Sequence, residues 1–99
     1  MKTKNEIITF LQKNRAYLCK TFHITKIALF GSFARDEQTD GSDVDLLIEL
    51  DDNLIDVYDT KESLKQFLSH SFDRSVDLAR EKYLKPYAKE FILKDAIYV

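Results

Sequence analysis

Apolar positions spaced three or four residues apart predict three long helices in this chain. The first runs from about residue 4 to 20 and begins after Thr3-x-x-Glu6, a capping-box pattern in which each side chain can bind the other residue's backbone N–H. The second covers residues 55–70, and the third begins near Pro86, because proline suits the first turn of a helix. The buried face of this last helix is expected to consist of Tyr87, Phe91 and Ile92.

Short apolar runs between the helices predict buried strands. These runs cover residues 26–30, 44–50 and 74–79. Ser32 is a good N-cap for a short helix over residues 33–38, and residues 96–99 are expected to form an edge strand or a docked tail. The order helix, strand, short helix, strand, helix, strand, helix predicts an α/β or α+β fold, in which a small sheet packs against helices.

Composition limits the classes of protein that this chain can belong to. Its 99 residues, 44% of them hydrophobic, suit a single domain over residues 1–99 with a real core. The net charge of −2 argues against stable nucleic-acid binding, which depends largely on neutralising phosphates. Cys19 is the one cysteine, so an internal disulfide is excluded. No apolar run approaches the ~20 residues that span a bilayer, and the mixed first ten residues do not resemble a secretory signal. We therefore expect a cytoplasmic protein.

Candidate chemistry is concentrated in residues 31–50, which hold both glycines. Gly31 lies where a strand gives way to a helix, so a phosphate could approach its backbone closely, and Ser32 adds a hydroxyl and free N–H groups. Asp43 and Asp45 lie at positions i and i+2 of a strand, which places both carboxylates on one face. Two such acids repel each other unless a cation lies between them. They are therefore either solvated surface acids or ligands of a divalent metal such as Mg²⁺.

A third acid, Asp77, interrupts the apolar strand 74–79. If this strand pairs with the strand that carries Asp43 and Asp45, three carboxylates meet on one face, and a metal would relieve their repulsion. Two metals about 3.5–4 Å apart are the usual arrangement for nucleotidyl transfer. Asp77 could then hold a metal or accept the proton of an attacking hydroxyl.

Residues 31–47, GSFARDEQTDGSDVDLL, resemble the Gly-Ser … Ser-Asp-x-Asp-Leu signature of polymerase-beta-like nucleotidyltransferases. The length and the order of elements resemble the minimal members of that superfamily, the MNT proteins. The resemblance implies that Gly31 and Ser32 contact nucleotide phosphates. It also implies that Asp43, Asp45 and Asp77 bind the metals and act as the catalytic acids.

Three further positions of the motif need separate interpretation. Arg35 matches the signature and either holds a phosphate or pairs with a nearby carboxylate. Ser42 also matches, and either belongs to the nucleotide site or tightens a turn. Asp36 departs from the pattern, since many minimal members have glycine there, and an acid facing the site would repel a triphosphate.

The resemblance also implies a partner and a reaction. Minimal nucleotidyltransferases commonly pair with a HEPN-domain ribonuclease toxin and act as its antitoxin by transferring AMP from ATP to a tyrosine of the toxin, with Mg²⁺, in two ions, as the metal. Two other functions remain open: neutralisation of the partner by binding alone, and nucleotidylation of a small-molecule hydroxyl. A homodimer or a hetero-oligomer with the toxin is compatible with each.

Overall fold

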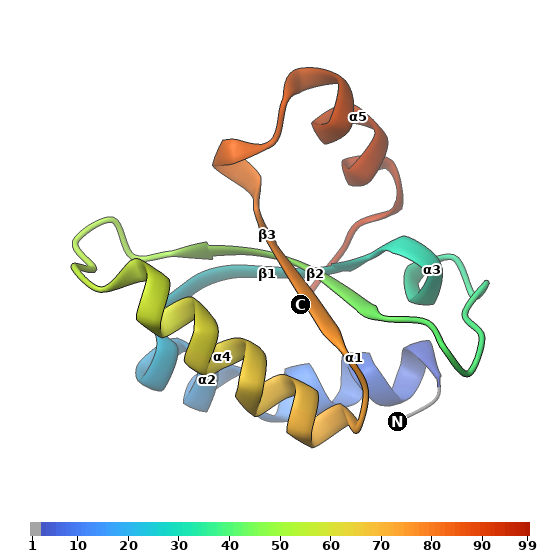
Figure 1. Cartoon of the computed structure of the whole chain (residues 1–99), viewed down its shortest axis with the longest axis horizontal. Helices are drawn as coiled ribbons and strands as arrows, with labels where there is room; N and C mark the ends of the chain where they lie inside the picture. The colour runs from blue at the N-terminus through green and yellow to red at the C-terminus, as the bar shows by residue number, and fades with distance from the viewer. Residues whose placement is uncertain (1–2) are drawn as a thin grey trace.

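The structure, a computed structural model, describes residues 3–99 and contains a mixed sheet with helices on both faces (Figure 1). In chain order the elements are α1 (Lys4–Lys13), α2 (Arg15–Phe22), β1 (Ile24–Phe30), α3 (Gly31–Ala34), β2 (Val44–Leu50), α4 (Val57–Phe72), β3 (Val76–Arg80), the 3₁₀ turn η1 (Glu81–Tyr83), α5 (Pro86–Asp95) and β4 (Ile97–Tyr98). Helices α1, α2 and α4 cover one face, and α5 stands over the other (Figure 1). The predicted fold class is confirmed.

The strands are arranged in the order β3-β2-β1-β4. β1 pairs antiparallel with both β2 and β4, whereas β2 and β3 are parallel. Parallel neighbours need a crossover connection, and α4 supplies it between β2 and β3. Residues 97–98 thus form an edge strand, which was one of the two expectations for the C-terminus. β2 lies between β1 and β3 and is paired along both edges, so the fold positions its side chains firmly.

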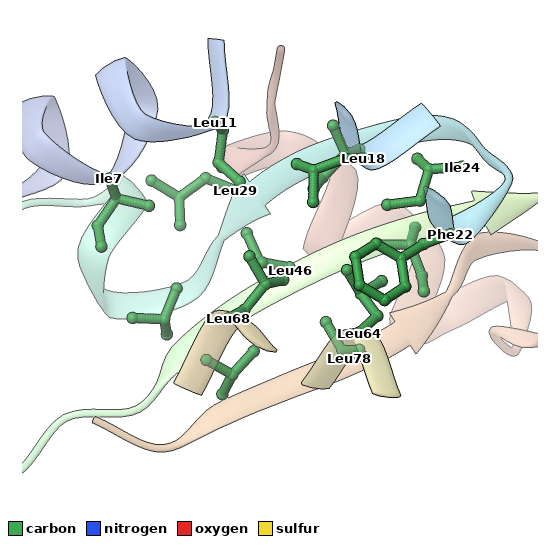
Figure 2. Close-up of a cluster of buried hydrophobic side chains, with 14 of the residues drawn as sticks. Ile7, Leu11, Leu18, Phe22, Ile24, Leu29, Leu46, Leu64, Leu68 and Leu78 are labelled. Atoms are coloured by element: carbon green, nitrogen blue, oxygen red, sulfur yellow. The ribbon is translucent and has the colours of Figure 1, made fainter. Parts of the chain in front are cut away.

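Alternation along β2 separates the core from the opposite face of the sheet. Val44, Leu46, Ile48 and Leu50 are buried and point to the side of α1, α2 and α4. There they join apolar side chains from all three helices in the cluster of Figure 2. Because side chains alternate with period two, Asp45 must point to the other face. The burial that stabilises the sheet therefore also fixes the direction of this acid.

The predicted first helix is in fact two helices that meet at Asn14. The Asn14 side chain donates from Nδ2 to the Phe10 carbonyl at 2.8 Å, and its backbone N–H donates to the same carbonyl at 3.0 Å. An asparagine that binds its own preceding turn competes with helix continuation. Its φ of −104° and ψ of 8° depart from helical values and end α1. The break lets α2 turn so that Leu18 still reaches the core, as Figure 2 shows.

The predicted buried face of the last helix is wrong. Tyr87 is 74% exposed and Phe91 is 69% exposed, while Ile92 is half-buried. The apolar spacing is real, but α5 is the only long helix on its side of the sheet in residues 3–99, and the short helix α3 and strand β1, which it contacts, leave Tyr87 and Phe91 uncovered (Figure 1). The spacing shows that an apolar stripe exists and does not show what covers it.

Candidate active site

Strand register gathers the predicted site around Asp45. Asp45 is opposite Phe30 in β1, the residue before Gly31, and opposite Asp77 in β3. The expected pairing between the strand of Asp77 and the strand of Asp45 is thus confirmed, although β3 runs over Val76–Arg80 rather than 74–79. Two segments far apart in the sequence meet on either side of one carboxylate.

Glycine is required at position 31 for two separate reasons. Its φ is +76°, in the left-handed region that side chains rarely adopt. A Cβ added there would lie 2.2 Å from Oδ2 of Asp45, well inside van der Waals contact. The β1–α3 turn and the Asp45 carboxylate are therefore packed directly against each other.

Helix α3 begins at Gly31, two residues earlier than a Ser32 cap would place it. The residue before it, Phe30, takes the N-cap position, and no side chain caps this helix. Ser32 therefore lies inside the first turn, and the prediction that it is the N-cap was wrong. The helix ends at Ala34 because Arg35 has φ −90° and ψ 0°, and Asp36 is left-handed.

The electrostatics of Asp45 favour a nearby cation. Partial burial raises the pKa of the Asp45 carboxyl, and the charges of Asp77 and Asp43 raise this pKa further, while Arg35 lowers it. Partial burial and the neighbouring negative charges both disfavour the ionised Asp45 carboxylate, so a divalent cation beside it would stabilise the ionised form. Asp43 and Asp77 are exposed and Asp45 is half-buried.

The three acids do not form a closed metal cage. Among residues 3–99, no group of three His, Cys, Asp or Glu side chains is arranged to hold a metal ion by itself. This arrangement still fits Mg²⁺, which usually takes one or two protein carboxylates and completes its shell with substrate phosphates and water. The donor set therefore suits a metal that binds together with a nucleotide, and Asp45 with Asp43 or Asp77 would supply its protein ligands.

Arg35 is engaged by carboxylates. Its Nε lies 2.9 Å from Oε1 of Glu37, and its Nη1 lies 3.2 Å from Oδ2 of Asp95 at the end of α5. The pair with Asp95 joins α3 to α5, and these contacts raise the pKa of Arg35. Of the two alternatives for Arg35, the structure shows pairing with carboxylates, at a position from which its charge also acts on Asp45.

Ser42 closes a turn. Its hydroxyl accepts from the Thr39 N–H at 2.8 Å, and its own N–H donates to the Thr39 carbonyl at 3.0 Å. This is the turn-tightening alternative for Ser42, and it shapes the loop just before Asp43.

The backbone at Asp36 explains why glycine is common at this position, and an ion pair explains why the acid is tolerated. Its φ is +57°, a value at which glycine is the least strained residue. Its carboxylate lies 3.0 Å from the Lys4 ammonium of α1 and is 63% exposed. Asp36 is also not one of the charges that shift the pKa of Asp45. The acid at this position therefore faces Lys4 rather than the candidate site.

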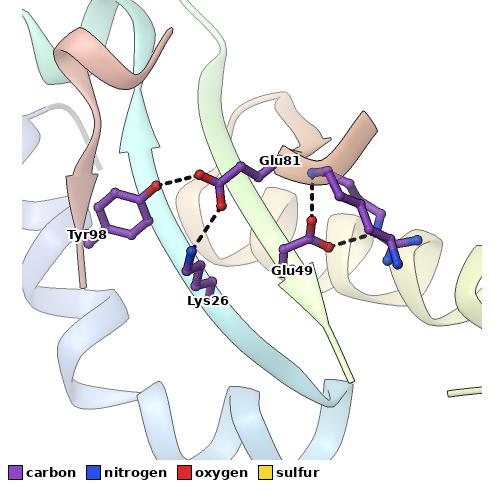
Figure 3. Close-up of polar contacts among 6 residues, drawn as sticks. Lys26, Glu49, Glu81 and Tyr98 are labelled. Carbon is purple, nitrogen blue, oxygen red and sulfur yellow. Dashed lines mark hydrogen bonds and ion pairs between the residues drawn. The ribbon is translucent and has the colours of Figure 1, made fainter. Parts of the chain in front are cut away.

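A polar network that the sequence did not point to crosses the same face of the sheet four residues further along β2. Glu81 binds the ammonium of Lys26 at 3.2 Å and accepts from the Tyr98 hydroxyl at 3.1 Å, while Glu49 binds Arg80 and the backbone N–H of Lys82 (Figure 3). The bond from Lys26 lowers the pKa of Glu81. Charged residues within the strands were the available signal. The Glu81 contacts join β1 and β4 to η1, and the Glu49 contacts join β2 to β3 and η1.

Comparison with known proteins adds the family. A nucleotidyltransferase domain profile matches residues 11–99. The chain belongs to the nucleotidyltransferase family. A putative protein adenylyltransferase of Methanocaldococcus jannaschii is 39% identical to this nucleotidyltransferase over the whole of both chains. The protein adenylyltransferase MntA of Thermococcus cleftensis is 30% identical, covering all of this chain and 98% of that one.

Solved structures agree with this assignment. A putative minimal nucleotidyltransferase is 28% identical with a TM-score of 0.76, over 93% of this chain and 92% of its own. Two complexes share the fold: a toxin–antitoxin with AMP-PNP at 24% identity and TM-score 0.66, and the tri-AMPylated HEPN toxin of Shewanella oneidensis with its MNT antitoxin at 22% and 0.56. Each matches over 96% of this chain, and over 70% and 66% of those chains respectively.

Within residues 3–99, no helix combines the length and apolar character needed to cross a membrane.

Proposed function

We propose that this nucleotidyltransferase transfers AMP from ATP to a tyrosine of a HEPN-domain toxin and so acts as its antitoxin. One observation carries the proposal: register places the half-buried Asp45 between the Gly31 turn and Asp77. A glycine turn packed against one of several neighbouring acids suits nucleotidyl transfer rather than simple binding. The full-length relatives named protein adenylyltransferases support a protein acceptor.

Each site residue has a proposed task. The backbone of Gly31 and Ser32 contacts the triphosphate, with Arg35 and Ser42 shaping the surrounding loop. The carboxylates of Asp43, Asp45 and Asp77 would hold Mg²⁺, in two ions, which supplies charge neutralisation and lowers the pKa of the attacking hydroxyl. The tyrosine oxygen attacks the α-phosphorus of ATP, the bond to pyrophosphate breaks, and Asp77 accepts the phenolic proton. We propose that a single domain over residues 1–99 carries this activity, in the cytoplasm where ATP is available.

An exposed aromatic stripe supports a protein partner. Tyr87 and Phe91 lie four residues apart on α5, where they form this stripe and are 74% and 69% exposed. Aromatic residues are enriched at protein interfaces. The Arg35–Asp95 pair links the last residue of α5 to the end of α3, so we expect a partner that covers this stripe to bind near the candidate site. Solved complexes of proteins with this fold contain a HEPN toxin, which is the partner we propose.

The deciding experiment is the intact mass of the HEPN protein co-expressed with this chain. We expect the wild type to add one or more AMP units and the Asp43→Asn, Asp45→Asn double variant to add none. The matched control is Asp51→Asn with Asp52→Asn, which removes two exposed charges at the other end of β2. An unmodified partner that still co-purifies with wild type and double variant would refute transfer and support neutralisation by binding, which the aromatic stripe alone could provide.

The stripe has its own test. We expect Tyr87→Ser with Phe91→Ser to abolish co-purification of the HEPN partner and its modification. The control, Ile55→Ser with Tyr58→Ser, removes two similarly exposed apolar side chains outside the stripe, at 91% and 75% exposure. Equal loss of binding in the two double variants would show that general surface apolarity, not α5, holds the partner.

A further inference from the structure

The loop between α3 and β2 connects the two halves of the candidate site. It begins after Ala34, next to the Gly31 turn, and ends with Ser42 and Asp43 before β2 starts at Val44. Its first residues are tied to α3, because Glu37 N–H donates to the Ser32 carbonyl at 2.8 Å. The last residues lie outside the strand ladder, so their position depends on other contacts.

Arg74, in the connection between α4 and β3, supplies those contacts. Its Nη1 donates to the Ser42 carbonyl at 2.7 Å, with the carbonyls of Thr39 and Asp40 at 3.5 Å. The shortest of these is a strong charge-assisted bond, and the other two are at the limit of hydrogen bonding. The same guanidinium lies 5.0 Å from the centre of the Phe33 ring in α3.

Arginine can make both contacts at once because its guanidinium is planar. It donates hydrogen bonds within its plane and stacks against a ring through its face. One side chain therefore joins the residue after Ser32 to the residue before Asp43. Phe33 is fully buried, so the stacked end is itself firmly held.

The base of Arg74 is also fixed relative to β2. The Arg74 N–H donates to the Ser69 carbonyl at 3.3 Å at the end of α4. The next residue, Ser75, accepts from the Val44 N–H at 2.9 Å. Arg74 is thus anchored beside the first residue of β2, one position from Asp43.

We propose that Arg74 is a positioning residue that fixes Asp43 relative to the phosphate-binding turn at Gly31 and Ser32. Asp43 is exposed and precedes the strand, so the Ser42 peptide determines where its carboxylate lies. Asp45 needs no such support, because strand register already holds it. The inference rests on the proposed function only for its catalytic consequence, since the ordering of the loop can be measured without activity.

The first test is amide hydrogen exchange in the Arg74→Lys variant, which keeps the charge and loses the planar donor. We expect exchange over residues 39–43 to rise about tenfold, the order expected for a lost bond to a charged group. The control is Arg15→Lys on α2, whose guanidinium also donates to a backbone carbonyl, that of Val99. We expect this control to leave the loop unchanged.

The second test separates positioning from general stability. Well below the melting temperatures of both proteins, we expect Arg74→Lys to raise the Mg²⁺ concentration for half-maximal transfer about tenfold. A purely structural role would lower the melting temperature and leave this midpoint unchanged, which would overturn the proposal. If the wild type transfers no AMP, the proposed function fails while the exchange result still decides the role of Arg74. If Arg74→Lys does not fold, the wild type decides: residues 39–43 exchanging as fast as an unstructured peptide would refute the proposal, and slow exchange would support it.

Discussion

Replacing Gly31 by alanine adds one methyl group at the point where the β1–α3 turn meets Asp45. The methyl carbon would lie 2.2 Å from Oδ2 and 3.0 Å from the carboxyl carbon of Asp45. The backbone there has φ +76°, which an alanine adopts only under strain. The carboxylate must rotate away or the turn must shift, and either movement separates the phosphate-binding turn from the acid.

The cost has two parts. Left-handed backbone costs an L-residue about 1–2 kcal/mol, and relieving a steric overlap in packed surroundings costs about 1–3 kcal/mol. We therefore expect Gly31→Ala to lower the free energy of unfolding by about 2–5 kcal/mol, out of the roughly 5–15 kcal/mol that is typical of a folded domain. Each kcal/mol corresponds to a fall of about 4–8 °C in Tm. AMP transfer should fall further than the folded fraction does, because the site itself is displaced.

The matched control is Gly41→Ala. A Cβ at Gly41 meets nothing within 4 Å, and Gly31 is the glycine with positive φ. Alanine there should be neutral or stabilise by about 0.4–1 kcal/mol through the unfolded state. Thermal and urea unfolding of both variants, with the transfer assay alongside, decide the matter: similar stability of Gly31→Ala and Gly41→Ala would refute the reasoning. A cycle with Asp45→Ala tests the contact itself, since the penalty of Gly31→Ala should fall to about 1–2 kcal/mol, the backbone part, once the carboxylate is gone.

Three further predictions concern the same site. Without metal, the raised pKa of Asp45 means that the folded state binds the proton more tightly than the unfolded state, so stability should fall as the pH rises above the usual carboxyl range. Asp45→Asn should flatten this part of a urea-unfolding series from about pH 4 to 7, and an unchanged slope would contradict the assigned cause. Asp36→Gly should stabilise the fold by about 1 kcal/mol, because glycine relieves the left-handed strain. It should leave AMP transfer unchanged, since Asp36 pairs with Lys4, and reduced transfer would place Asp36 in the site. Mg²⁺ and ATP together should raise Tm. At a hundredfold excess of ligand over its Kd, binding should add about 2.7 kcal/mol to the free energy of unfolding. Neither ligand alone should match this shift in a scanning fluorimetry experiment, and a full shift with ATP alone would argue against a shared site.

Short-range features of the sequence determined much of this picture. The Asp-x-Asp pattern predicted two acids at the start of one strand, and the apolar run after them predicted the buried strand β2, although Asp43 lies just before β2 and only Asp45 is in it. The capping box at Thr3 and Glu6 is present, with Glu6 N–H donating to Thr3 Oγ1 at 3.1 Å. Such features depend on local backbone preferences and side-chain periodicity, which are set by neighbouring residues and do not depend on the rest of the fold.

Tertiary structure decided the rest. Register alone sets Asp77 beside Asp45, and it results from the packing of whole strands and helices rather than from any residue near Asp77. The contact that requires glycine at position 31 joins two different strands, so no local pattern contains it. Helical spacing predicted the apolar stripe of Tyr87 and Phe91, yet the direction that α5 faces depends on its connections to β3 and β4. The role of Arg74 depends on carbonyls more than thirty residues earlier in the chain. The sequence by itself therefore determined the local conformation of each segment and the chemical groups that it carries. Packing between distant strands and helices, summed over the sheet, determined which of these groups lie next to one another.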